Sequence, residues 1–402
     1  MTLTRACRAF PAALVLLLAA CGTGASPSNS PASPSSGAPS AAASSAASPA
    51  AGSASSSASA AAPASKAASS QRFSIGNVAL DPLPQRAPIH LSINLTAYYV
   101  IPIYMAIAKG YFDKAGLDVN MELAKQTNLT VPRLSKGELD IADTSAKPPL
   151  FNQVAEGFNA RIISSTTIFR SGRVANTWLS VDPAKANQFH ELGDLKGTTV
   201  EAGLEGSALD QFVSQGLEQA GLKLGKDVNI TFRAKGPSDM LALARSHAAD
   251  VIVMPEPVAT QAESEGLLKR WKSDADLIPW YQALYLVASD HFRTSNRPAL
   301  VKFLEVYLAS AREVNASNGT WQDDVLQTTA KQTTIDADVL KKMGGVPLSE
   351  PNGAVSMDSL TRTQDLWVGR GLVKQPVKDF GQLVDTSPLD EALQAIGRAP
   401  AP

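Results

Sequence analysis

The sequence predicts an α/β protein with two lobes, and three observations lead to this prediction. Segments rich in β-branched residues alternate with amphipathic helical segments, which is typical of a parallel sheet with helices on both faces. This alternation stops and restarts after residues 193–197, so the folded part divides into two blocks. The chain has 402 residues and, without its Ala/Ser/Pro-rich start, still exceeds the size of one hydrophobic core.

The chain begins with features of an exported protein. Arg5 and Arg8 precede a short apolar run, so residues 1–20 are predicted to be a signal peptide rather than a membrane span. The run ends in LAAC at residues 18–21, which resembles the bacterial lipobox and implies a lipid on Cys21. Residues 21–86 are then the lipidated Cys and a disordered Ala/Ser/Pro linker, because small side chains bury too little surface to fold. We expect a lipid-anchored protein on the outer face of the cell membrane, or on the periplasmic side where a second membrane exists.

The first block is predicted from changes in hydrophobic periodicity. Strands are expected at 89–95, 118–123, 140–143 and 160–167. Helices are expected at 98–115, where apolar residues recur at helical spacing, and at 129–136 and 148–156.

The second block repeats this order, and a helical tail follows it. Strands are expected at 198–202, 228–232 and 250–254, helices at 207–220 and 238–246, and flanking strands at 176–181 and 284–289. The tail from residue 297 should pack on the first lobe. Lobe 1 is therefore predicted to hold residues 87–172 and 291–402, and lobe 2 residues 173–290. The chain would cross twice, near 170–173 and 289–293, and two crossings make a hinge beside a ligand cleft.

Composition excludes several function classes. The net charge is −1 and there is no long basic run, which argues against nucleic acid as a partner. Cys7 and Cys21 both precede the folded part, so disulfides, thiol catalysis and cysteine-bound zinc are not expected there. The four histidines are scattered without metal-binding spacing. We expect no metal, no cofactor and a tethered monomer.

Five motifs carry a resemblance to a known family. They are IYMAIAKGYF with AGLDV (103–112 and 115–119), KGELDIA (136–142), DLKGTTV with GS (194–200 and 206–207), DVIVMPEP (250–257), and QDLW with GLV (364–367 and 371–373). In order and spacing they resemble the NitT/TauT-type substrate-binding proteins for nitrate, sulfonates, taurine and thiamine-precursor pyrimidines. The resemblance implies a type II periplasmic-binding fold, a small-molecule ligand and an ABC permease as partner.

Candidate binding residues follow from a general rule for α/β sheets. Ligands lie beyond the carboxyl ends of strands, where helix N-termini present free N–H groups. The rule selects Thr96, Tyr98, Tyr99, Thr127, Asn128, Thr144, Ser145, Thr166, Thr167, Gly206, Ser207, Ala208 and Glu256. Arg170 and Trp280 join them because they lie near the two crossings. Each has a structural alternative: Thr127, Ser145 and Ser207 as helix caps, one of the two tyrosines and Trp280 in packing, and Glu256 as a first-turn carboxylate.

The residue types do not decide which class of ligand is bound. Arg170 and Arg173 suit a sulfonate or carboxylate. Asp143, Glu201 and Glu256 suit a ligand with amine or ring N–H donors. No enzyme is expected, but two alternatives stand: an enzyme like thiamine-pyrimidine synthase, and a sensor for a membrane signalling partner. The synthase needs a Cys-rich run, which the folded part lacks.

Overall fold

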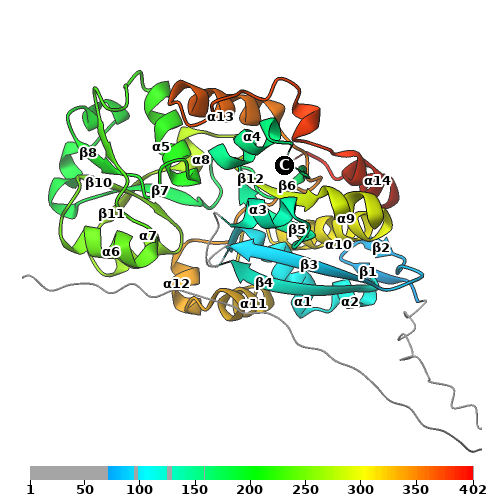
Figure 1. Ribbon diagram of the computed structural model, residues 1–402. Helices are drawn as coiled ribbons and strands as arrows, with labels where there is room; N and C mark the ends of the chain where they lie inside the picture. Colours follow the sequence, from blue (N-terminus) through cyan, green and yellow to red (C-terminus); the bar gives the residue numbers. More distant parts are fainter. Residues whose placement is uncertain (1–70, 95–97, 125–128, 158, 402) are drawn as a thin grey trace, which may run out of the picture. The chain divides into compact units, whose positions relative to one another are not determined.

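The computed structural model describes residues 71–94, 98–124, 129–157 and 159–401 (Figure 1). Residues 1–70, which hold the predicted signal peptide, the predicted lipid site Cys21 and most of the predicted linker, lie outside the described residues, as do Thr96, Thr127 and Asn128. The described residues form two five-stranded sheets and a small hairpin. Each large sheet with its helices makes one lobe.

The sheet of lobe 1 has the strand order β4-β3-β5-β12-β6. Strand β3 (Ala87–Asn94) pairs in parallel with β4 (Leu117–Ala124) and β5 (Ile141–Ser145). Strand β12 (Leu284–Ser289) runs antiparallel to both β5 and β6 (Ala160–Ser165). The expected all-parallel sheet is therefore wrong. The boundary of lobe 2 at residue 290 also needs correction, because the chain has returned to lobe 1 by Leu284.

The sheet of lobe 2 has the strand order β11-β7-β10-β8-β9 and is also mixed. Strand β8 (Thr199–Glu201) pairs in parallel with β9 (Asn229–Thr231) and β10 (Val251–Pro255). Strand β7 (Thr177–Val181) runs antiparallel to β10 and to β11 (Lys269–Ser273). The sequence did not predict β11, because its residues KRWKS carry three cations and form a half-buried edge.

Alternate residues of the lobe 1 strands face two different helix layers, as the two-residue strand period requires. Leu286 and Ala288 face α1 (Ile101–Ala108), α10 (Arg297–Asn315) and α14 (Ser387–Ile396). Tyr285 and Val287 face α3 (Thr130–Ser135), α4 (Pro148–Ala155) and α13 (Met357–Gly369). The tail helices thus belong to lobe 1.

Two segments of lobe 1 differ from prediction. The helix expected over 98–115 is three pieces: a 3-10 turn (Tyr98–Val100), α1 and α2 (Tyr111–Lys114). The break falls at Gly110, because glycine is a weak helix former. Residues assigned to the linker form the hairpin of β1 (Phe73–Ile75) and β2 (Val78–Leu80), whose Ile75 and Leu80 are buried in the core of lobe 1. The folded part therefore begins before residue 87.

The helices of lobe 2 also cover both faces of its sheet. Helix α5 (Ala208–Gln219) packs on one face, where the core includes Ile278 just after α8 (Asp274–Leu277). Helices α6 (Pro237–Arg245) and α7 (Val258–Ser264) cover the other. Three further helices, α9 (Asp290–Ser295), α11 (Asp323–Thr333) and α12 (Ala337–Lys342), belong to the tail region. Within the described ranges, no helix combines the length and apolar character needed to cross a membrane.

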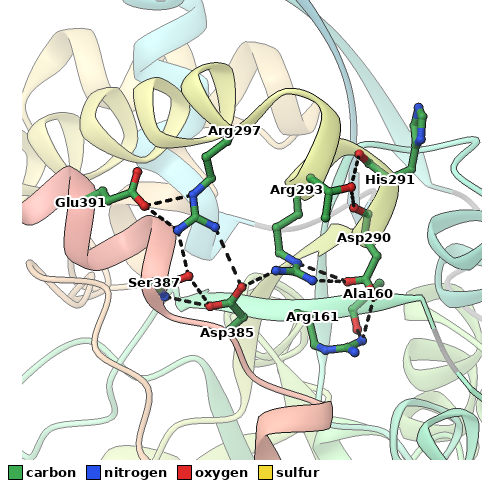
Figure 2. A network of polar contacts seen from close by, with 10 residues as sticks. Ala160, Arg161, Asp290, His291, Arg293, Arg297, Asp385, Ser387 and Glu391 are labelled. Atoms are coloured by element: carbon green, nitrogen blue, oxygen red, sulfur yellow. Dashed lines mark hydrogen bonds and ion pairs between the residues drawn. The ribbon is translucent and has the colours of Figure 1, made fainter.

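A chain of ion pairs connects α14 to α9 and α10 (Figure 2). Asp385, just before α14, accepts a hydrogen bond from Arg293 of α9 at 2.5 Å. Arg297, at the start of α10, pairs with Glu391 of α14 at 2.6 Å. Arg293, Arg297 and Asp385 are half-buried, and these pairs fix α14 beside α9 and α10.

Candidate functional site

A cavity of about 220 Å³ lies between the two lobes. Lobe 1 and the crossing segments contribute Asn94, Tyr98, Tyr99, Ser145, Lys147, Phe169, Ala283 and Leu284. Lobe 2 contributes Asn176, Thr177, Ser207, Ala208, Leu209, Phe212, Pro255 and Glu256. The walls are mainly aromatic and aliphatic, with a few polar groups, which is the usual character of a small-molecule site.

The structure brings together six residues that the strand-end rule selected. Tyr98, Tyr99, Ser145, Ser207, Ala208 and Glu256 all line the cavity. Both tyrosines are there, although one was expected in packing only. Tyr98 combines the two roles, because it also packs against Leu326, Leu340 and Met343 and donates its hydroxyl to the Ala175 carbonyl at 3.1 Å.

The other selected residues lie elsewhere. Thr144 is buried in β5, and its hydroxyl donates to the neighbouring Ser145 carbonyl. Thr166 and Thr167 are buried under the segment around Ser349, which forms a β-bridge with Thr167. Glu201, considered for its charge, accepts hydrogen bonds from Thr231, Arg233 and Ala234 inside lobe 2.

Arg170 and Trp280 do not line the cavity, and their side chains contact each other. The Arg170 guanidinium lies 5.3 Å from the Trp280 ring, and Trp280 is 53% exposed. Their segments are the two crossings, which hydrogen-bond to one another: the Phe169 N–H donates to the Tyr281 carbonyl at 3.1 Å, and the Trp280 N–H donates to the Phe169 carbonyl at 2.6 Å. The crossings therefore form a paired, two-segment connection between the lobes.

Sequence reasoning did not select Lys147, the cavity residue that matters most for the charge of a ligand. It is the N-cap residue of α4 and half-buried, and no described carboxylate forms an ion pair with it. Burial lowers the pKa of Lys147, and the nearby Asp143 opposes this shift. A sequence signal existed: Lys147 precedes Pro148-Pro149, and proline favours the first turn of a helix, so Lys147 marks a helix start just beyond a strand end.

The N-terminus of α5 forms the facing wall. The Ser207 hydroxyl caps the helix by accepting the Asp210 N–H at 3.3 Å. The N–H groups of Ala208 and Leu209 have no partner among the described residues. Capping and cavity lining are thus compatible in Ser207. Two free N–H groups at the positive end of a 12-residue helix attract a negative group.

Two carboxylates near the cavity already accept hydrogen bonds from protein groups. Asp143 accepts hydrogen bonds from the Tyr99 hydroxyl at 2.7 Å and from both nitrogens of Asn94. Glu256 accepts from the Arg270 guanidinium at 2.9 Å and the Thr260 N–H at 3.0 Å. Burial raises the pKa of each, and these donors oppose the shift.

A third carboxyl group, Asp274, lies behind the cavity wall. Its Oδ1 accepts the Asn176 N–H at 3.2 Å, whereas its Oδ2 has no partner among the described residues. Complete burial raises the pKa of Asp274 to about 8. Asn176 lines the cavity, and its side-chain oxygen is buried without a partner in the described part of the chain.

The described residues contain no group of three His, Cys, Asp or Glu side chains that could hold a metal ion. The cavity itself has no described histidine or cysteine on its walls. Its chemistry is that of hydrogen bonding, one lysine charge and apolar contact.

Comparison with solved structures supports the fold. The periplasmic aliphatic sulphonate-binding protein SsuA from Escherichia coli is similar with a TM-score of 0.61 at 19% identity, covering 77% of this chain and 100% of that one. The periplasmic nitrate-binding protein NrtA from Synechocystis PCC 6803 gives 0.60 at 14% identity, covering 78% and 89%. The ligand-binding component of an ABC-type import system from Staphylococcus aureus gives 0.61 at 13% identity, covering 76% and 99%.

These similarities identify the fold as the type II periplasmic-binding fold, as expected. No curated protein matches this sequence significantly. A family profile does match it, over residues 97–317, which is more than half of the chain. That segment includes the lobe 2 sheet, every strand of the lobe 1 sheet except β3, and most of the cavity walls. The chain therefore belongs to the NMT1/THI5-like family.

Proposed function

We propose that this protein is the extracytoplasmic substrate-binding component of an ABC import system. It captures a small molecule between its lobes and delivers it to a membrane permease, tethered by a lipid on Cys21. The observation that carries the proposal is the cavity whose walls come from both lobes, beside two paired crossings. A ligand that contacts both walls favours the closed arrangement, which is the signal a transporter needs. The similar structures described as binding sulphonates and nitrate support this reading.

The preferred cargo is a compact molecule with an acidic group, of the sulfonate, taurine or nitrate type. Lys147 and the free N–H groups of α5 face one cavity and provide a charge and two donors for an anion. The aromatic and aliphatic walls suit a short carbon chain. A pyrimidine-like cargo is the second candidate, because Asn176, Thr177 and Ser207 bring amide and hydroxyl groups to the cavity walls.

The test combines ligand screening with one charge removal. Thermal unfolding of the full chain is measured with nitrate, taurine, ethanesulfonate and hydroxymethylpyrimidine. A ligand at 100 times its dissociation constant stabilises the folded state by about 2.7 kcal/mol. Lys147→Met should weaken binding of an anion by about 10- to 100-fold, the value of one charge-assisted hydrogen bond. The matched control is Lys226→Met, at an exposed lysine outside the cavity.

Each outcome either identifies the class of cargo or contradicts the proposal. Stabilisation by an anion that Lys147→Met abolishes and Lys226→Met preserves supports the anionic cargo. Stabilisation by hydroxymethylpyrimidine that Lys147→Met leaves unchanged assigns the pyrimidine cargo. Anion binding that survives Lys147→Met unchanged contradicts the role given to Lys147. Turnover of the pyrimidine would identify the synthase-like alternative, and ligand binding in a protein whose loss leaves uptake intact would identify the sensor.

A further inference from the structure

Helix α13 contacts α4 of lobe 1 and α5 of lobe 2 (Figure 1). Its Trp367 is completely buried in the core of lobe 1. The Trp367 indole N–H donates to the Ala146 carbonyl at 3.0 Å. Ala146 lies between Ser145 and Lys147, two residues that line the cavity. Trp367 therefore holds the lobe 1 wall.

Arg370, one turn further along, reaches lobe 2. Its guanidinium pairs with the carboxylate of Asp210 and with Glu205 at 2.9 Å. The same guanidinium lies 5.7 Å from the Trp367 ring and 5.3 Å from the ring of Phe232, which belongs to lobe 2. One side chain thus bridges the lobes by charge and by stacking.

Asp210 connects Arg370 to the loop that leads into the cavity wall. It is fully buried in the first turn of α5 and accepts the Gly206 N–H at 2.8 Å. The Asp210 N–H in turn donates to the Ser207 hydroxyl. The 206–207 loop leads directly to Ala208 in the cavity. On its other side Gly206 faces Pro148 of lobe 1, so closely that a Cβ on Gly206 would lie 2.9 Å from the Pro148 ring.

We propose that Arg370 is a latch that holds the two lobes together without ligand and positions the N-terminus of α5 opposite Lys147. The buried Asp210 carboxylate needs a cation, and Arg370 of lobe 1 supplies it. Opening the lobes separates this pair, so the pair opposes opening. This inference goes beyond the proposed function, because it concerns the lobe equilibrium and holds for any cargo.

The experiment measures the distance between the lobes in the full chain without ligand. Cys7 and Cys21 are replaced by serine, and spin labels are placed at the exposed positions Ala242 of lobe 2 and Thr294 of lobe 1. Pulsed electron resonance then gives the distance distribution. The parent protein should show one dominant distance. Arg370→Gln should raise the ratio of open to closed molecules by about tenfold or more, as expected for loss of a buried ion pair.

Two further variants make the result decisive. Arg370→Gln/Asp210→Asn removes the latch without leaving a buried charge, and it carries the test if Arg370→Gln does not fold. Arg245→Gln is the matched control, because Arg245 pairs with Glu265 inside lobe 2. Opening in both Arg370 variants, and not in the control, supports the latch. An unchanged distribution in the folded variants overturns it. Opening in Arg370→Gln alone also overturns it, because the stranded Asp210 charge would then be the cause.

Discussion

The pKa of the buried Asp274 carboxyl group allows the pH dependence of stability to be calculated directly. Its pKa is raised to about 8 by burial, against about 3.9 in an unfolded chain. Between pH 4 and 8 the folded state therefore holds a proton that the unfolded state releases. The unfolded state binds fewer protons there, so stability falls as pH rises, by about 1.4 kcal/mol per pH unit for this group.

Asp274→Asn removes this titration and keeps a neutral side chain whose oxygen can still accept the Asn176 N–H. The stability of the variant relative to the parent should increase by about 4 kcal/mol from pH 5 to pH 8. Urea unfolding followed by circular dichroism at each pH measures the difference, and titrations elsewhere cancel. Asp276→Asn, an exposed carboxyl group in the same helix, is the control. Parallel pH profiles for Asp274→Asn and the parent would refute the reasoning.

Two further predictions concern stability. Gly206→Ala should cost about 1–3 kcal/mol in thermal unfolding, because φ is +72° and the new Cβ would meet Pro148. Gly157→Ala, also at positive φ but with open space around it, gives the backbone part alone, and equal losses would show that the Pro148 contact is irrelevant. Arg293→Ala should cost about 1–2 kcal/mol, because it breaks half-buried pairs with Asp290 and Asp385. The exposed pair of Arg398 supplies the control, and no larger loss for Arg293→Ala than for Arg398→Ala would contradict the network's role.

The alternation between strand-like and helix-like hydrophobic periodicity predicted two lobes. It could do so because the periodicity reflects which face of each element is buried, and the local sequence encodes that directly. Strand partners are set by the whole chain, and there prediction failed. Residues 284–289 were correctly expected to form a strand, yet nothing local shows that β12 inserts between β5 and β6 of lobe 1. The charged residues 269–273 gave no strand signal, because β11 is held by pairing with β7 rather than by burial.

The strand-end rule succeeded where its premise holds. Ser145 ends a strand that runs parallel to β3, and Ser207 follows one that runs parallel to β10, and both line the cavity. Thr166 and Thr167 follow β6, which is antiparallel to β12, and the segment around Ser349 covers that end. The rule concerns parallel strands, and β6 pairs with no parallel strand of the described sheet.

The charges around the cavity explain why residue types alone could not identify the class of cargo. Asp143, Glu201 and Glu256 suggested a ligand with N–H donors. In the structure Asp143 accepts from Tyr99 and Asn94, and Glu256 pairs with Arg270. Glu201 pairs with Arg233 inside lobe 2 and does not line the cavity. Lys147 has no such partner among the described residues and faces the free N–H groups of α5 across the cavity. Because Glu256 is paired with Arg270 and Asp143 is engaged by Tyr99 and Asn94, Lys147 and the N-terminus of α5 are the positive groups left to contact a ligand, and both favour an anion.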